Sequence, residues 1–239
     1  MSELRDLVID AHGGIDRWNK VNALHGDMSI TGLLWARKGW PDVLKNVRVT
    51  VDTKTQFASY HPFTDPNKRS LYRPDHTVIE TLDGKILEER RSPRSAFGNH
   101  KPETAWDILD LAYFSGYAMW NYLCTPFLFA LPGFRTEEIE PWNESGETRR
   151  RLKVTFPETI ATHCPEQIFH INDDGLVCRL DYGAAIAGNI PTAHYIEDYK
   201  TVNGIRIGTK RRALRRNPDG TAIATPAAVN IEIENIRFS

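Results

Sequence analysis

Histidines and tyrosines on predicted strands are the residues of this chain best suited to acid–base chemistry. The segment AHYIEDY at 193–199 mixes a histidine with carboxylates and tyrosines, and its alternation does not decide which face points inward. A histidine close to carboxylates could act as a general base near neutral pH. We therefore take His194 and His163 as candidate acid or base residues, and Tyr182 or Tyr199 as a candidate proton donor.

A second group of residues carries the nitrogen and sulfur atoms that zinc prefers as ligands. His163 and Cys164 are adjacent, and His170 and Cys178 follow nearby. Adjacent residues on a strand face opposite sides of a sheet, and these spacings match no compact metal motif. We therefore expect no metal site. No phosphate-binding loop, dinucleotide fingerprint or nucleophile elbow occurs either, so we expect no organic cofactor.

A third set of residues has the mixture of aromatic walls and few polar groups that is typical of a small-molecule pocket. Some recur at helical spacing and others lie on predicted strands. The candidate ligand-binding residues are Tyr60, His61, Tyr113, Tyr117, Trp120, His170, Cys178, Arg179 and Tyr199. The aromatic members suit a plain core equally well, and Arg179 suits a solvent-facing ion pair with Asp181. The sequence leaves these alternatives open.

Two apolar segments predict the helices that would position these residues. Three-four spacing predicts a helix over 2–21, which the Gly13-Gly14 pair should kink or divide. A second helical region covers 104–131 and is apolar almost all round. Its length alone would allow a membrane span. Polar residues and Pro126 interrupt it, however, so we predict a buried helix.

The rest of the chain has the two-residue alternation of strands. About four strands are predicted over 24–91, and the run MSITGLLWARKG at 28–39 is assigned to them. Asp83-Gly84 predicts a hairpin, and short connections favour antiparallel pairing. Eight to eleven such strands cannot bury their faces as a flat sheet. We predict an α+β fold: a strongly curved antiparallel sheet (half-barrel) with helices packed on its concave face, forming one domain over 1–239.

Charge and composition narrow the functional classes. Among 239 residues, 30 are basic and 31 are acidic, which gives no general reason to expect nucleic-acid binding. We interpret the basic runs at 149–153 and 210–216 as solvated, charged edge strands, with Glu232 and Glu234 able to lie across from Arg206 and its neighbours. Three cysteines cannot form a disulfide framework, and MSELRDLVIDAHGG lacks the regions of a signal peptide. We therefore expect a cytoplasmic protein.

Several segments together carry a resemblance to a known fold. AHGGIDRW follows the first helix, helices are inserted into a long β-meander, and INDDGLVCRLDY, DYKTVNGIRI and NIEIENIRF lead to the last hairpin. In this layout the chain resembles the LolA-like fold of bacterial lipoprotein carriers and of a violacein-pathway enzyme, and more specifically a family of uncharacterised bacterial proteins. The resemblance implies a hydrophobic ligand cavity and carries over no catalytic residue. The carriers are exported with a signal sequence, which this chain does not show.

Three functional hypotheses follow. The first is a cytoplasmic binding protein or carrier for a hydrophobic small molecule, aromatic or lipid-like, held between the curved sheet and the helix at 104–131. The second is a cofactor-independent enzyme, of cyclase, isomerase or lyase type, acting on a hydrophobic or aromatic substrate in the same cavity. The third is a partner-binding module that uses the arginine-rich edge or an exposed aromatic helix. The sequence does not predict the oligomeric state.

Overall fold

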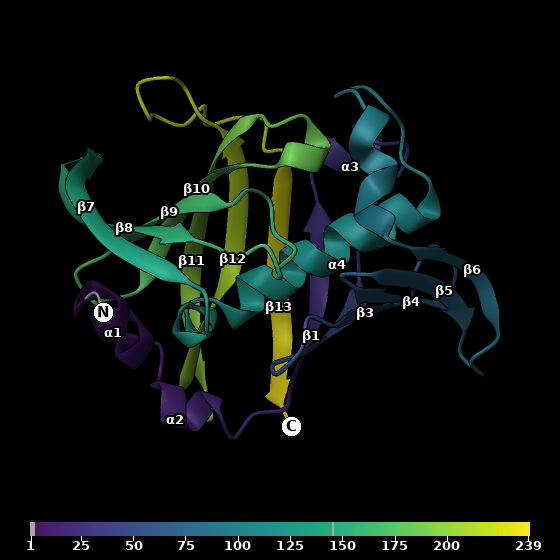
Figure 1. Cartoon of the computed structure of the whole chain (residues 1–239), viewed down its shortest axis with the longest axis horizontal. Coiled ribbons are helices and arrows are strands. Elements are labelled where there is room, and N and C mark those ends of the chain that lie inside the picture. Colours follow the sequence, from purple (N-terminus) through teal and green to yellow (C-terminus); the bar gives the residue numbers. More distant parts are fainter. Residues whose placement is uncertain (1–2, 145) are drawn as a thin grey trace.

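The chain folds around one thirteen-stranded antiparallel sheet, whose concave face carries the long helix α4 (Ile108–Cys124) (Figure 1). This computed structural model describes residues 3–144 and 146–239. The strand order is β6-β5-β4-β3-β2-β1-β13-β12-β11-β10-β9-β8-β7, so the sheet remains open between β6 and β7. The predicted α+β fold with a strongly curved sheet is confirmed.

The longest strands are β11 and β12, with 12 and 11 residues. In chain order, the strands are β1 (Ala23–Thr31), β2 (Val47–Asp52), β3 (Ala58–His61), β4 (Lys68–Arg73), β5 (His76–Thr81), β6 (Ile86–Arg91), β7 (Arg135–Glu144), β8 (Glu147–Thr155), β9 (Glu166–Ile171), β10 (Val177–Gly183), β11 (Pro191–Val202), β12 (Ile205–Arg215) and β13 (Val229–Phe238). The helices are α1 (Glu3–Ala11), α2 (Ile15–Trp18), α3 (Leu33–Arg37) and α4, with short 3-10 turns η1 (Pro93–Asn99), η2 (Phe127–Ala130) and η3 (Ala185–Ala187).

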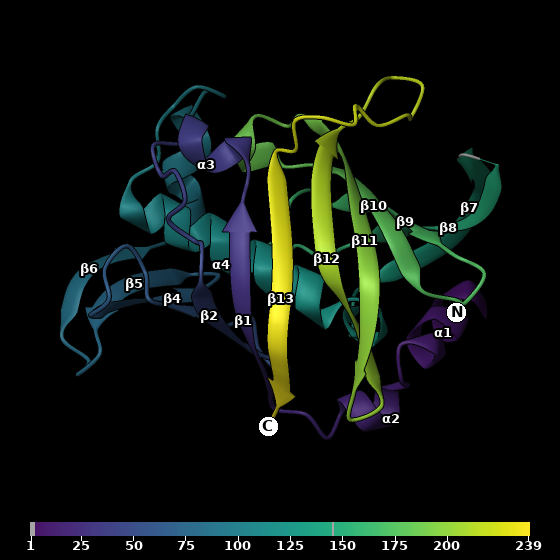
Figure 2. The same ribbon diagram turned by 180° about the vertical axis from the view of Figure 1, so that it is seen from behind.

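The strand nearest the C-terminus completes the centre of the sheet. Strand β13 pairs with β1 on one side and with β12 on the other, with Ile231 opposite Ile30 and Val229 opposite Ala213. Viewed from behind, β1, β13, β12 and β11 lie side by side and α4 crosses beyond them (Figure 2). The two halves of the sheet are therefore joined through β13.

Helix α4 is buried from Leu109 to Cys124. A capping box begins it: the Asp107 carboxylate accepts from the Asp110 backbone N–H at 2.8 Å, and the Asp110 carboxylate accepts from the Asp107 N–H at 3.3 Å. The helix ends before Pro126, as the sequence predicts, and is shorter than the predicted segment. Among the described residues, no helix has the length and apolar character needed to cross a membrane.

Two differences from the sequence prediction matter for the site. The region over 24–91 contains six strands rather than about four, and the sheet has thirteen strands rather than the predicted eight to eleven. In addition, the run assigned to a strand at 28–39 contains helix α3. Gly32 has a φ of 122°, which ends β1, and the N–H groups of Leu33 and Leu34 then donate to the carbonyls of Ala227 and Ala228. A tertiary contact therefore overrides the local strand pattern.

The division of the first helical segment is confirmed. Helices α1 and α2 are separated at Gly13 and Gly14, whose φ values are 124° and 83°. A side chain at Gly13 would meet the backbone of Gly204, because the α1–α2 corner packs directly on the β11–β12 turn.

Candidate ligand cavity

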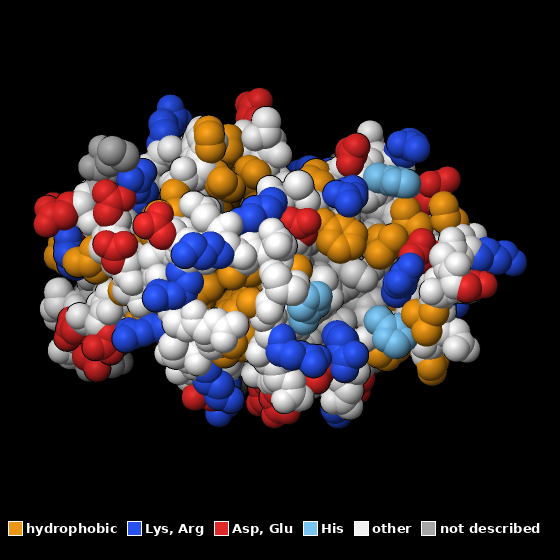
Figure 3. Space-filling model, turned by 90° about the horizontal axis from the view of Figure 1, so that it is seen from below, with side chains coloured by type: hydrophobic (Ala, Val, Ile, Leu, Met, Phe, Trp, Pro, Cys, Tyr) orange, Lys and Arg blue, Asp and Glu red, His pale blue; other side chains and the backbone are white. Residues whose placement is uncertain are grey.

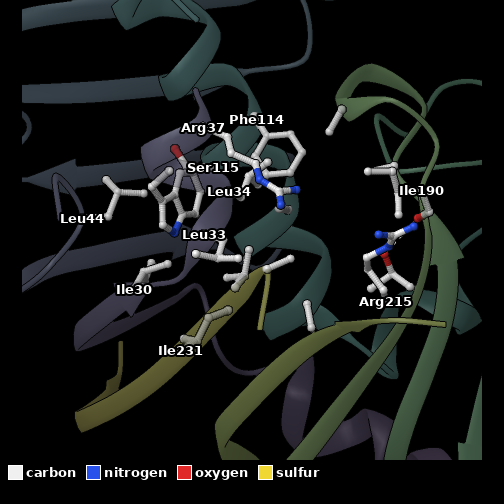
Figure 4. A pocket seen from close by; sticks show the side chains of 18 of the residues that line it. Ile30, Leu33, Leu34, Arg37, Leu44, Phe114, Ser115, Ile190, Arg215 and Ile231 are labelled. Carbon is white, nitrogen blue, oxygen red and sulfur yellow. Dashed lines mark hydrogen bonds between the residues drawn. The ribbon is translucent and has the colours of Figure 1, made fainter. Parts of the chain in front are cut away.

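An apolar cavity of about 310 Å³ lies between the two helices α3 and α4 and the central strands (Figure 4). Its walls include Leu34 and Trp35 from α3, Phe114 and Met119 from α4, and Ile231 from β13. The alternating burial of β13 turns its isoleucines toward the helices, and α4 is apolar on every side. The lining is therefore mostly apolar, although Arg37, Arg215, Ser115 and two threonines also belong to it.

Two tyrosines of the cavity wall lead into a buried chain of hydrogen bonds. Tyr122 and Tyr182 line the cavity, and their hydroxyls lie 2.8 Å apart. The Tyr122 hydroxyl is 2.7 Å from His163 Nε2, and the Tyr117 hydroxyl is 2.9 Å from His163 Nδ1. The Tyr182 hydroxyl is 3.3 Å from His194 Nδ1. The chain thus connects α4, the 156–165 loop, β10 and β11.

Burial keeps every member of this chain neutral at pH 7. It lowers the pKa of His163 to about 3 and the pKa of His194 well below its usual value. Burial also raises the pKa values of Tyr122 and Tyr182. The expectation of a general base near neutral pH is therefore not met at either histidine, because desolvation lowers both pKa values and the nearby Arg94 and Arg211 lower them further.

One direction of donation gives every hydroxyl of this hydrogen-bond network an acceptor for its proton in the neutral state. Tyr117 donates to His163 Nδ1, and His163 Nε2–H donates to Tyr122. Tyr122 then donates to Tyr182, which donates to His194 Nδ1. Within this hydrogen-bond network, only His194 Nε2 has no partner among the described residues of the protein. The arrangement suits a fixed, uncharged wall rather than proton abstraction.

Arg211 lies behind this wall and is 5% exposed. Its Nη2 donates to the Tyr122 carbonyl at 3.1 Å, and its guanidinium carbon lies 5.6 Å from the centre of the Tyr122 ring. Within residues 3–144 and 146–239 it forms no salt bridge, and burial lowers the pKa of this guanidinium. The nearby charge also disfavours protonation of His194.

The structure brings two of the predicted site residues to the cavity. Tyr60 and Tyr182 both line it, together with Ser115. The Tyr60 hydroxyl donates to the Ser115 carbonyl at 2.8 Å, so its polar end is satisfied inside the protein. His163 and His194 do not line the cavity, but each is hydrogen-bonded to a tyrosine that does: His163 to Tyr122 and His194 to Tyr182.

The aromatic residues predicted from α4 belong to the core instead. Tyr113 packs edge to face on Tyr72 at 5.6 Å between ring centres. The Trp120 indole N–H donates to the Asp52 carbonyl at 2.8 Å, and Tyr117 is hydrogen-bonded within the buried chain. None of the three lines the described cavity. Because α4 is covered all round, its tyrosines and tryptophan split between several packing contacts.

Arg179 is fully buried in an ion network, and the solvent-facing alternative for it is wrong. It is 1% exposed, with Nε 2.7 Å from Asp181 and Nη1 2.6 Å from Glu144. His170 Nε2 lies 3.2 Å from the same Asp181, and Arg179 Nη2 donates to the Gly220 carbonyl. The end of β7 and the 217–221 turn cover this face, which strand alternation alone does not show.

The remaining predicted ligand-binding residues lie elsewhere. His61 borders a separate surface hollow over β1, β2 and β13. The Tyr199 hydroxyl donates to the Val177 carbonyl at 2.6 Å, and the Cys178 thiol donates to the His170 carbonyl at 3.4 Å. These side chains hold neighbouring strands together rather than meeting at one cavity.

Several residues that surround the cavity are not predicted by the sequence patterns. Tyr122 and Arg37 are not among the predicted site residues, and the pattern at 28–39 predicts a strand where α3 forms. Alternation in KRRALRR does place Arg211, Ala213 and Arg215 on one face, and Ala213 and Arg215 line the cavity. This alternation therefore predicts a shared face for these residues, which the interpretation as a charged edge strand does not use.

Several charged side chains outside the cavity are paired with opposite charges. In the β7–β8 hairpin the pairs are Arg149–Glu147, Arg150–Glu138 and Lys153–Glu137. Lys210 lies opposite Glu232, but Arg206 pairs with Thr201 of β11. The expectation that the basic runs form edge strands is wrong, because β12 lies between β11 and β13 and β8 lies between β7 and β9. On the face shown in Figure 3, basic and acidic side chains are interspersed. The described residues contain no group of three potential metal ligands.

Comparisons with known proteins find similarity in structure only. No family model matches the chain, and no curated protein matches it. A DUF1329 family protein from Desulfovibrio piger is 15% identical, with 98% of this chain and 91% of that chain covered and a TM-score of 0.53. A LolA superfamily protein from Nitrosomonas europaea is 9% identical, with coverages of 97% and 92% and a TM-score of 0.54.

A third solved structure extends the same similarity. An outer membrane lipoprotein-sorting protein domain from Vibrio parahaemolyticus is 10% identical, with 99% of this chain and 91% of that chain covered and a TM-score of 0.53. At these identities the likeness concerns the fold alone. It extends over nearly the whole chain, including the strands and helices that form the cavity.

Proposed function

Starting from a LolA-like fold with an apolar cavity on its concave face, we propose that this protein binds and carries a hydrophobic small molecule, aromatic or lipid-like. The cavity of about 310 Å³ is the observation that carries the proposal. One structural neighbour is described as a lipoprotein-sorting domain, which agrees with handling of apolar groups on this fold.

The wall chemistry supports binding driven by burial of apolar surface. Such burial contributes about 25 cal/mol for each Å² removed from water. The volume is at the lower end of the range for small-molecule sites, which favours a compact ligand or a single chain. The hydroxyls of Tyr60, Tyr122 and Tyr182 already form hydrogen bonds within the protein, so an apolar ligand does not leave them without a partner.

The buried histidines favour a carrier over the enzyme alternative. A base with a pKa of about 3, as for His163, removes protons poorly at neutral pH. Partner binding through an exposed aromatic helix is not supported either, because α4 is buried from Leu109 to Cys124.

The first experiment is native mass spectrometry of the protein, purified under mild conditions from cells that naturally make it, followed by extraction of any bound compound. The expected result is a reproducible mass shift and an apolar compound in the extract. A mass equal to that of the unliganded chain, together with no binding of apolar probes in vitro, would reject the proposal.

Cavity-filling variants locate the binding site. Ala118→Phe in α4 and Ala213→Phe in β12 each place a ring in the cavity, and either should abolish the bound mass. Ile86→Phe, on an exposed position of β6, is the matched control and should leave ligand binding intact. Thermal unfolding of each variant verifies that it is folded.

A cytoplasmic setting remains part of the proposal. Its support is that all three cysteines, Cys124, Cys164 and Cys178, are free thiols, which agrees with a reducing compartment. Cell fractionation of the natural host with an antibody against the protein tests this. Recovery in a periplasmic or membrane fraction would contradict it.

A further inference from the structure

The charged side chains that line the cavity are two arginines. Arg37 is the last residue of α3, and Arg215 is the last residue of β12. Figure 4 shows them on opposite sides of the space, with the apolar side chains of Ile30, Leu44 and Ile231 farther along it. No acidic side chain belongs to the described lining.

Neither arginine has a partner of its own in the described part of the chain. Along the same strand, Lys210 lies 3.6 Å from Asp198 and Arg212 lies 2.9 Å from Glu197. Arg37 and Arg215 form no ion pair or side-chain hydrogen bond within residues 3–144 and 146–239. This positive pair is local, because the whole chain carries a net charge of −1.

Resting on the proposed function, we propose that the ligand is an anionic amphiphile, whose apolar body fills the cavity and whose carboxylate is held by Arg37 and Arg215 at the opening. Guanidinium groups bind carboxylates through two parallel N–H···O bonds, which makes them strong and directional partners. An anion between the two arginines also removes the repulsion between like charges.

The interior of the cavity fixes the orientation of such a ligand. The Tyr60 hydroxyl donates to Ser115, and the Tyr122 and Tyr182 hydroxyls bond to each other. Arg211 lies behind Tyr122 and is not part of the lining. A carboxylate placed deep in the cavity would lose its water without gaining a partner, which is strongly unfavourable. The charged end therefore belongs beside the two exposed arginines.

Four probes with the same ten-carbon chain test the inference. They are decanoate, decyl phosphate, decanol and decylamine, each titrated calorimetrically below its micelle-forming concentration. We expect decanoate to bind about tenfold or more tightly than decanol, as a charge-assisted pair provides. Added salt should weaken decanoate binding and leave decanol binding unchanged. Decyl phosphate distinguishes a preference for carboxylate from a general preference for anions.

Variants assign the effect to the two arginines. Arg37→Gln with Arg215→Gln should reduce decanoate affinity to that of decanol while decanol affinity is retained. Arg212→Gln, an exposed arginine away from the cavity, is the matched control and should keep the preference. Equal affinities of decanoate and decanol for the wild type would overturn the anionic ligand and leave the hydrophobic carrier standing. Failure of all four probes to bind would count against both.

Discussion

At the scale of single residues, two buried arginines in this protein have opposite surroundings. Arg179 contacts the carboxylates of Asp181 and Glu144, whereas Arg211 has aromatic rings and a carbonyl as neighbours. Burying an unpaired cation is costly, and breaking a buried ion pair is costly for the same reason. The two positions should therefore respond differently to removal of the charge.

Replacing each arginine with methionine tests this difference. We expect Arg211→Met to leave the free energy of unfolding unchanged or to raise it, because a buried cation without a counter-ion is removed. Arg179→Met should lower it by about 3–5 kcal/mol, because it leaves buried carboxylates uncompensated. Urea unfolding at pH 7 measures both. If Arg211→Met lowered the free energy of unfolding as much as Arg179→Met, the contacts of Arg211 with Tyr122 would outweigh the cost of burying its charge.

The buried histidines predict a loss of stability in acid. The pKa of His163 is about 3 in the folded protein and near 6.5 when unfolded, so only the unfolded chain takes up a proton between these values. The stabilisation is complete above pH 6.5 and is lost as the pH falls toward 3. The slope is about 1.4 kcal/mol per pH unit for this one group.

The variant His163→Gln isolates that contribution. Urea unfolding between pH 6 and 4 should give it a slope smaller than that of the wild type by about 1.4 kcal/mol per pH unit. Carboxylates titrate in both proteins and cancel in the comparison. Equal slopes would mean that His163 is protonated in the folded protein.

At the scale of elements, the contact of α4 with the sheet depends on a glycine. A side chain at Gly116 would collide with Cβ and the ring of Tyr72 in β4, so the helix can approach this strand only where it has no Cβ. Alanine at 116 would gain about 1 kcal/mol in helix propensity but would overpack the contact.

We expect Gly116→Ala to lower the free energy of unfolding by about 1–3 kcal/mol in spite of that gain. Gly98→Ala in η1, where a Cβ would meet no atom within 4 Å, is the control and should change stability little. Thermal unfolding of both proteins measures the difference. An unchanged or higher Tm for Gly116→Ala would show that α4 can shift on the sheet.

The same scale shows what sequence patterns can and cannot predict. The alternation of Val47, Val49 and Val51 and the Asp83-Gly84 turn depend on neighbours along the chain, and they indicated the strands and the hairpin correctly. Helix α3 depends on carbonyls of Ala227 and Ala228, which are distant in sequence. Local propensity contains no information about such a partner, so the wall that α3 supplies was missed.

The aromatic residues of α4 show a related limit for the site. Three-four spacing groups Tyr113, Tyr117 and Trp120 on one side of a helix, which favours a shared pocket. The side of α4 that faces the cavity is a different one, which carries Phe114, Ala118 and Tyr122, and a helix buried all round gives no sequence signal for which side that is. Residue types predicted the chemistry of the walls, but three-dimensional packing decided which residues form them.

At the scale of the whole molecule, strand β13 joins two groups of strands that pair with each other only through it. A chain ending at residue 228 would leave both β1 and β12 with an unpaired edge and would lose Val229 and Ile231 from the cavity. Unpaired edges and a lost cavity wall should prevent cooperative folding.

We expect such a truncated chain to show no sharp urea transition, and a synthetic peptide of residues 229–239 added in excess to restore it. Far-ultraviolet circular dichroism follows both steps. The same truncation with a peptide carrying Ile231→Asp is the control and should remain unfolded. A cooperative transition in the truncated chain alone would show that the two groups of strands fold separately.

The central place of β13 also governs when the protein becomes functional during its synthesis. Translation produces β1 early and β13 last among the strands, yet these two are direct neighbours in the sheet. A nascent chain on the ribosome can form hairpins such as β4–β5 but not the cavity. The cavity therefore cannot form before β13 has been translated, and a product terminated before β13 presents open strand edges to cellular quality control.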